Sequence, residues 1–93
     1  MYNTPHLILR ALPGKRTASA FVVPKHLNCS AVERNTLRRR GYAALGERLA
    51  TVETPHTLVF LFKRGAKTLS TRVLGDEIQT LLDKATPKEY NTP

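Results

Sequence analysis

Residues 30–49 have the sequence SAVERNTLRRRGYAALGERL, and this stretch predicts the helix around which the rest of the chain is arranged. Ser30 and Glu33 have the spacing of a capping box, in which the two residues satisfy each other's backbone N–H groups. Because successive helical residues are about 100° apart, one side of this helix carries an apolar stripe. The stripe consists of Leu37, Gly41, Ala44, Leu45 and Leu49. It predicts that the helix packs on a sheet.

The first half of this helix is dense in arginine, with Arg34, Arg38, Arg39 and Arg40. No acidic residue follows any of them by three or four positions, so the helix offers them no ion pair of its own. Cations early in a helix oppose its dipole at a cost of about 0.3–1 kcal/mol each. Arginine also suits bidentate contacts with phosphate. The run therefore favours a binding function, with a solvated basic helix as the alternative interpretation.

Composition limits the class of protein. Ninety-three residues support one domain, and a net charge of +8 indicates polyanionic partners. Nucleic acid is favoured over a membrane surface, because no amphipathic segment combines bulky apolar residues with a lysine-rich face. A single cysteine, Cys29, excludes an internal disulfide and fits a reducing compartment. With no signal peptide or spanning segment in the sequence, we expect a cytoplasmic protein.

Along the chain, strands are expected at residues 6–12, 18–23 and 58–62, and a second helix from residue 70 or 71 to residue 85. The order β-β-α-β-α predicts an α+β fold, a small two-layer α/β sandwich whose sheet has three strands, or four. The short connection at residues 13–16 predicts that the first two strands form an antiparallel hairpin. Both have apolar residues on each face, which predicts that both faces of the sheet are at least partly covered.

The wholly apolar strand at 58–62 is expected in the centre of the sheet. We expect residues 1–5 to be flexible, residues 6–85 to form a single RNA-binding domain, and residues 86–93 to be a disordered tail.

Residues 31–39, with the sequence AVERNTLRR, resemble the signature helix of the bacterial ribonuclease P protein subunit. That family carries Ala-Val or Ala-His, one further residue, Arg-Asn-Arg, a hydrophobic residue and Lys-Arg. In the same register, residues 21–26 (FVVPKH) resemble the family's strand that runs into paired basic residues. Residues 58–65 (LVFLFKRG) and the final helix resemble its last strand, basic turn and C-terminal helix. The likeness extends over roughly residues 17–84.

The sequence departs from the family pattern in several places. Thr36 stands in the position of the second arginine of Arg-Asn-Arg, and Lys25-His26 replaces a pair of lysines. The family also begins with a basic helix that helps to form the cleft for the 5′ leader, whereas the first strand expected here begins at residue 6. The resemblance therefore extends more fully to binding of the RNA subunit than to binding of the leader.

The resemblance implies a function in the maturation of tRNA 5′ ends. In the family, a catalytic RNA with Mg²⁺ hydrolyses the phosphodiester between the 5′ leader and the mature tRNA. The implied partners are the catalytic RNA subunit and precursor tRNA. Mg²⁺ would be bound mainly through the RNA, so we expect no catalytic and no metal-binding residue in this chain. The implied RNA-binding residues are Lys25, His26, Arg34, Asn35, Arg38, Arg39, Arg40 and Arg64.

Two site interpretations have a structural alternative. Phe21 and Phe60 are candidates for a leader cleft, in which unpaired bases would stack on aromatic rings. Aromatic side chains in apolar strands are more often part of the core. Asn35 could contact a ribose hydroxyl or a base edge, or could cap the first turns of its helix.

The sequence offers little support for a protein active site. His6, His26, His56 and Cys29 lack the spacing of metal ligands, and there is neither a glycine-rich phosphate loop nor a nucleophile elbow. Two further functions remain open. The chain could be a general RNA-binding or ribosome-associated protein of the same fold without a cleavage role, or an interaction module whose arginines bind an acidic protein.

Overall fold

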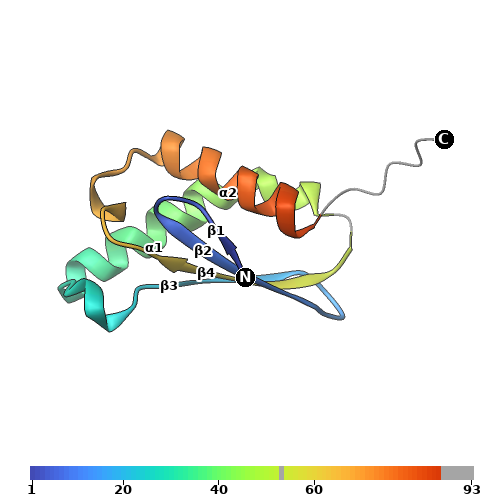
Figure 1. Cartoon of the computed structure of the whole chain (residues 1–93), viewed down its shortest axis with the longest axis horizontal. Coiled ribbons are helices and arrows are strands. Elements are labelled where there is room, and N and C mark those ends of the chain that lie inside the picture. The colour runs from blue at the N-terminus through green and yellow to red at the C-terminus, as the bar shows by residue number, and fades with distance from the viewer. Residues whose placement is uncertain (53, 87–93) are drawn as a thin grey trace.

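A computed structural model describes residues 1–52 and 54–86 of the chain. It contains a four-stranded sheet with two helices on the same side, which confirms the expected α+β class (Figure 1). The strands are β1 (Tyr2–Asn3), β2 (Leu7–Pro13), β3 (Ala18–Val22) and β4 (His56–Phe62), and the helices are α1 (Ala31–Leu45) and α2 (Thr71–Ala85). Three short 3₁₀ helices lie in the connections: η1 (Lys25–Leu27), η2 (Gly46–Thr51) and η3 (Ala66–Thr68).

The strands lie in the order β1-β2-β4-β3, so β4 occupies an interior position, as its apolar sequence predicts. The predicted hairpin is wrong, because β4 lies between β2 and β3. It pairs antiparallel with β2, Leu9 opposite Phe60, and parallel with β3, Phe21 opposite Phe60. The reason is the connection through α1. A helical crossover returns the chain to the starting end of the sheet, so the next strand can lie parallel to the one before. The most apolar strand thereby gains a neighbour on each edge.

The helix-facing side of the sheet forms the core. The stripe of α1 and the apolar seam of α2 both point into it, as expected from their spacing. Its fully buried large side chains are Leu7, Leu9, Leu58, Phe60, Phe62, Leu74, Ile78, Leu81 and Leu82. The opposite side carries half-buried residues such as Ile8, Val59 and Leu61. Within the described residues no helix lies on that side, so the helices cover one face, and the other, expected to be at least partly covered, carries these half-buried side chains (Figure 1).

The N-terminal segment is an edge strand that is tied to α2. Tyr2 and Asn3 pair antiparallel with β2, and Thr4 is buried. The Thr4 hydroxyl donates to Glu77 Oε1 at 2.6 Å, and the backbone N–H of His6 donates to the same oxygen at 2.9 Å. His6 Nδ1 lies 2.6 Å from Glu77 Oε2. We call this set of contacts the Glu77 clasp. In place of the flexible terminus that we expected at residues 1–5, the structure has an anchored strand.

The predicted tail lies mostly outside the described residues. Its first residue, Thr86, is described and is buried, with its hydroxyl donating to the carbonyl oxygen of Leu82 at 2.7 Å. Residues 87–93 are not described, so the disordered tail and the domain limits stay predictions.

Gly41 determines how closely α1 approaches the sheet. A Cβ at this position would lie 2.5 Å from Cδ1 of Phe21, whose ring is stacked on Phe60 with centroids 4.7 Å apart. We predict that Gly41→Ala lowers the free energy of unfolding by about 1–3 kcal/mol, because the stacked rings or the helix must shift. This cost exceeds the gain in helix propensity, which is at most about 1 kcal/mol. Urea unfolding monitored by circular dichroism measures the change.

Gly75→Ala in α2 is the matched control. A Cβ there would lie 2.9 Å from a terminal nitrogen of Arg48, which belongs to a flexible side chain and can move. We expect this variant to be neutral or more stable by up to about 1 kcal/mol. Equal destabilisation of the two variants would show that contact with Phe21 is not the cause.

The Glu77 clasp predicts a dependence of stability on pH. Burial tends to raise the pKa of Glu77, but the hydrogen bonds from Thr4 and His6 outweigh it, so the pKa is lowered overall. A lowered pKa in the folded state means that the clasp stabilises the protein above the unfolded value of about 4.3, and that this contribution disappears as the pH falls through the folded pKa.

We therefore predict that Glu77→Gln lowers the free energy of unfolding by about 1–2 kcal/mol at pH 7. The difference from the unmodified protein should shrink below about pH 4 as the carboxyl group becomes protonated. Thermal denaturation between pH 7 and pH 3 tests this. Asp76→Asn, the exposed neighbour on α2, should change stability by no more than about 0.5 kcal/mol at either pH. If the free energies of unfolding of Glu77→Gln and the unmodified protein differed by the same amount from pH 7 to pH 3, the stabilising role of the ionised Glu77 carboxylate would be contradicted.

Candidate nucleic-acid interface

Basic residues from three separate segments meet at one end of the molecule. Since β3 and β4 run parallel, both end at the same edge of the sheet, and α1 begins beside them (Figure 1). Two contacts join α1 to the turn after β4: Arg40 donates to the carbonyl oxygen of Lys67 at 3.0 Å, and Lys67 Nζ lies 2.9 Å from Glu33 Oε2. We call this region the basic end. Its cations are Lys25, His26 (when protonated), Arg34, Arg38, Arg39, Arg40, Lys63, Arg64 and Lys67.

The capping box predicted at the start of α1 is present and extends to the turn. The Ser30 hydroxyl accepts from the backbone N–H of Glu33 at 3.1 Å, and the N–H of Ser30 donates to Glu33 Oε1 at 2.9 Å. The hydrogen bond from Lys67, followed by those from Ser30, lowers the pKa of Glu33 to about 2. Glu33 is thus a carboxylate at all physiological pH values. Its charge is matched by Lys67 and does not oppose an approaching polyanion.

Arg34 has a structural role that its sequence position did not reveal. Its guanidinium donates to two backbone carbonyl oxygens, that of Val23 at 3.2 Å and that of Cys29 at 3.4 Å. These contacts attach the connection between β3 and α1 to the helix. A guanidinium has five N–H donors, so contact with an RNA phosphate stays possible and stays a prediction for this residue.

Arg38 and Arg39 are free of ion pairs. The described residues contain two ion pairs, His6 with Glu77 and Lys67 with Glu33, and neither includes an arginine of α1. Arg39 is exposed, and Arg38 donates to the side-chain oxygen of Asn35 at 2.8 Å. This bond leaves the amide N–H groups of Asn35 as donors for a ligand and orients Arg38 along the helix surface. The outward side of α1 thus presents two available guanidinium groups.

Lys25 and His26 are exposed on η1, and Arg64 is exposed directly after β4. His26 and Arg64 border the same shallow hollow of about 400 Å³, so the structure brings together residues that are 38 positions apart. Lys63 also borders it, but its ammonium group donates to the carbonyl oxygen of Thr4 at 2.9 Å and holds the N-terminal segment. The hollow and the contacts to Lys67 therefore bring η1, the start of α1 and the turn after β4 together at this end of the molecule.

The predicted leader cleft at Phe21 and Phe60 is wrong. The two side chains are 4% and 0% exposed, and their rings stack on each other at an interplanar angle of 11° under the helices. The reason is the alternation of side chains along a strand. Phe21 and Phe60 are register partners, and both fall on the helix-facing side of the sheet. No base can stack on these rings while the helices remain in place.

The described residues contain no group of three or more His, Cys, Asp or Glu side chains that could hold a metal ion. They also include no helix of the length and apolar character needed to cross a bilayer.

The chain is thus a small α+β protein, with a four-stranded sheet, two helices on one side and a cationic end. The family model described as ribonuclease P matches residues 1–86. The chain belongs to the ribonuclease P family, as the resemblance of the α1 sequence predicts. Members of this family take part in tRNA processing.

Two solved structures from Staphylococcus aureus share the fold. The structure of the RNase P protein at 2.0 Å resolution has a TM-score of 0.71 and 16% identity, and covers 91% of this chain and 81% of its own chain. A mutant of the RNase P protein with defective mRNA degradation activity has a TM-score of 0.76 and 16% identity, with coverage of 90% and 72%. No protein with a curated description matches the chain.

The α1 arginines make different contacts, so replacing them with alanine should change the free energy of unfolding by different amounts. Arg34→Ala removes the two bonds to backbone carbonyl groups and should lower the free energy of unfolding by about 1–2 kcal/mol. Arg39→Ala should change it by less than about 0.5 kcal/mol, since the side chain is exposed and makes no ion pair in the described structure. Guanidinium chloride unfolding compares the two. Equal free energies of unfolding for Arg34→Ala and Arg39→Ala would contradict the structural role assigned to Arg34.

Proposed function

We propose that this chain is the RNA-binding protein subunit of ribonuclease P, which assists a catalytic RNA in removing the 5′ leader from precursor tRNA in the cytoplasm. The proposal rests on one observation: this member of the ribonuclease P family gathers its cations at the basic end. In the described part of the chain its α1 arginines make no ion pair, and the carboxylate of Glu33 on the same helix is neutralised by Lys67. The partners are the catalytic RNA subunit and precursor tRNA.

The basic end would act through phosphate neutralisation. A folded RNA holds phosphates from several strands close together, and cations placed among them release condensed counterions. Arg38 and Arg39 on α1 would make such contacts, together with Lys25 and Arg64 from the neighbouring segments. Planar guanidinium groups can bind a phosphate through two parallel N–H bonds, which fixes orientation as well as affinity. The protein thus contributes binding and positioning.

The chemistry belongs to the RNA in this proposal. Mg²⁺ would be bound mainly through the catalytic RNA, as the family resemblance implies. Among the described carboxylates, Glu33 and Glu77 have shifted pKa values, and both are engaged in structural contacts. Neither is placed to act as a general base.

The deciding experiment measures cleavage of precursor tRNA by the cognate catalytic RNA at low Mg²⁺, with and without the protein. We expect cleavage to be faster with the protein. If the protein binds the RNA without any stimulation, the general RNA-binding function of the same fold replaces this proposal. If it binds neither RNA, an acidic protein partner becomes the better explanation of the basic end.

A second measurement tests the residues. The double variant Arg38→Ala/Arg39→Ala should weaken RNA binding and reduce the slope of log affinity against log salt concentration by about 1.4–1.8, which corresponds to two lost phosphate contacts. Lys15→Ala/Arg16→Ala is the matched control, since this exposed pair removes the same charge from the turn between β2 and β3, at the other end of β3. An equal change of slope in both variants would contradict binding at the basic end.

A further inference from the structure

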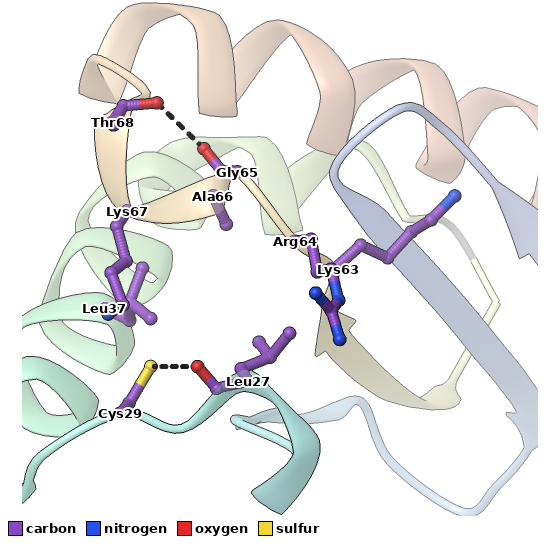
Figure 2. Close-up of a pocket in the computed structure, with 9 residues that line it drawn as sticks. All are labelled: Leu27, Cys29, Leu37, Lys63, Arg64, Gly65, Ala66, Lys67 and Thr68. Carbon is purple, nitrogen blue, oxygen red and sulfur yellow. Dashed lines mark hydrogen bonds between the residues drawn. The ribbon is translucent and has the colours of Figure 1, made fainter.

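A hollow of about 300 Å³ lies within the basic end, enclosed by η1, the first half of α1 and the turn after β4 (Figure 2). Phosphate contacts do not account for it, because most of its wall is apolar. Leu27 and Cys29 form one side, Leu37 another, and Ala66 closes the inner end. The hollow therefore suits a ligand that has an apolar part as well as a negative charge.

The walls suit a flat ring. Leu37 and Ala66 are buried members of the core, so the inner surface of the hollow is fixed. Leu27 and Cys29 are half-buried and belong to the same cluster at its margin. The volume lies at the lower end of the range for ligand pockets, about 300–1,000 Å³. It is enough for a single heterocycle.

The opening of the hollow is cationic. Arg64 is exposed and makes no hydrogen bond or ion pair with any other described residue, and Figure 2 shows its guanidinium beside Leu27. Lys67 stands at the same opening, held in place by Glu33. Lys63, although it borders the hollow, turns its ammonium group away to Thr4. Arg64 is therefore the cation best placed to meet a charged group attached to a ring.

We propose that this hollow receives one unpaired nucleobase of an RNA bound at the basic end, with the aliphatic side chains of Leu27 and Leu37 against the base and Arg64 on the adjoining phosphate. The inference rests on the proposed function and adds a feature of the RNA that the protein selects. Unpaired bases that are turned out of a helix are the parts of an RNA that proteins bind in pockets, often with an arginine plane against them. Charge favours RNA over an apolar side chain of a protein, because cations line the opening and the neighbouring carboxylate is neutralised.

The test compares two RNA hairpins that differ by a single bulged uridine in the stem. At low salt, we expect the protein to bind the bulged hairpin about fivefold to tenfold more tightly than the fully paired one, at the low end of the range for a base stacked on an aromatic ring because the walls here are aliphatic. With 4-thiouridine at the bulge, photo-crosslinking should attach the RNA to residues 27–37 or 63–68. Equal affinity for both hairpins, or crosslinks elsewhere, would overturn the inference.

Variants separate the hollow from general RNA binding. Cys29→Phe fills the hollow and should abolish the preference while affinity for the paired hairpin is retained. Cys29→Ala leaves the hollow open and should keep the preference. Arg64→Gln, a change at an exposed side chain, should reduce the ratio of the two affinities at least twofold, and it decides the matter if Cys29→Phe does not fold. A ratio that survives both Cys29→Phe and Arg64→Gln contradicts the inference.

Together, the cleavage assay and the hairpin comparison distinguish failure of this inference from failure of the proposed function. If the protein stimulates the catalytic RNA but shows no preference for the bulge, the inference about the hollow fails and the proposed function stands. If there is no stimulation, the proposed function fails whichever hairpin is bound.

Discussion

The parallel pairing of β3 with β4 is the constraint on which the rest of the structure depends. It requires a crossover, which α1 provides, and it places the ends of both strands beside the start of that helix. Three basic segments that are far apart in the sequence therefore share one end of the sheet. The same pairing aligns Phe21 with Phe60, and α1 packs closely against their stacked rings at Gly41. The position of the arginines in space is thus set by the packing of β4, a strand that contains no lysine, arginine, aspartate or glutamate.

The helix, its cap and its apolar stripe could be predicted because each depends on residues close together in the sequence. Ser30 and Glu33 are three positions apart, and the stripe follows from the helical period alone. The order of the strands could not be predicted in this way. A short connection such as residues 13–16 favours a hairpin, but the gain from placing the most apolar strand between two neighbours is a property of the whole sheet. Sequence patterns therefore located β2, β3, β4 and both helices, but missed β1 and paired β2 with β3.

For the candidate site, too, the sequence located some features and only the three-dimensional structure could show others. Family resemblance located the basic residues, and the structure brings Lys25, His26 and Arg64 to the same end as α1. It does not support equal roles for the four arginines of α1. Arg34 holds the connection before its own helix, and Arg40 binds a backbone carbonyl of the turn. Such contacts join residues up to 27 positions apart, so no local pattern could reveal them. Phe21 and Phe60 failed as site residues because the sequence did not reveal which side of the sheet the helices cover.

The Glu77 clasp has a consequence for the outer edge of the sheet. β1 covers part of the edge of β2, whose backbone N–H and C=O groups would otherwise be open to another strand. That cover consists of two residues, and it is kept in place by side chains that reach α2. Glu77 lies 71 positions along the chain from His6 and 73 from Thr4, yet its carboxylate holds the segment that covers this edge. Loss of that carboxylate would therefore uncover backbone groups of β2 as well as lower the stability of the fold.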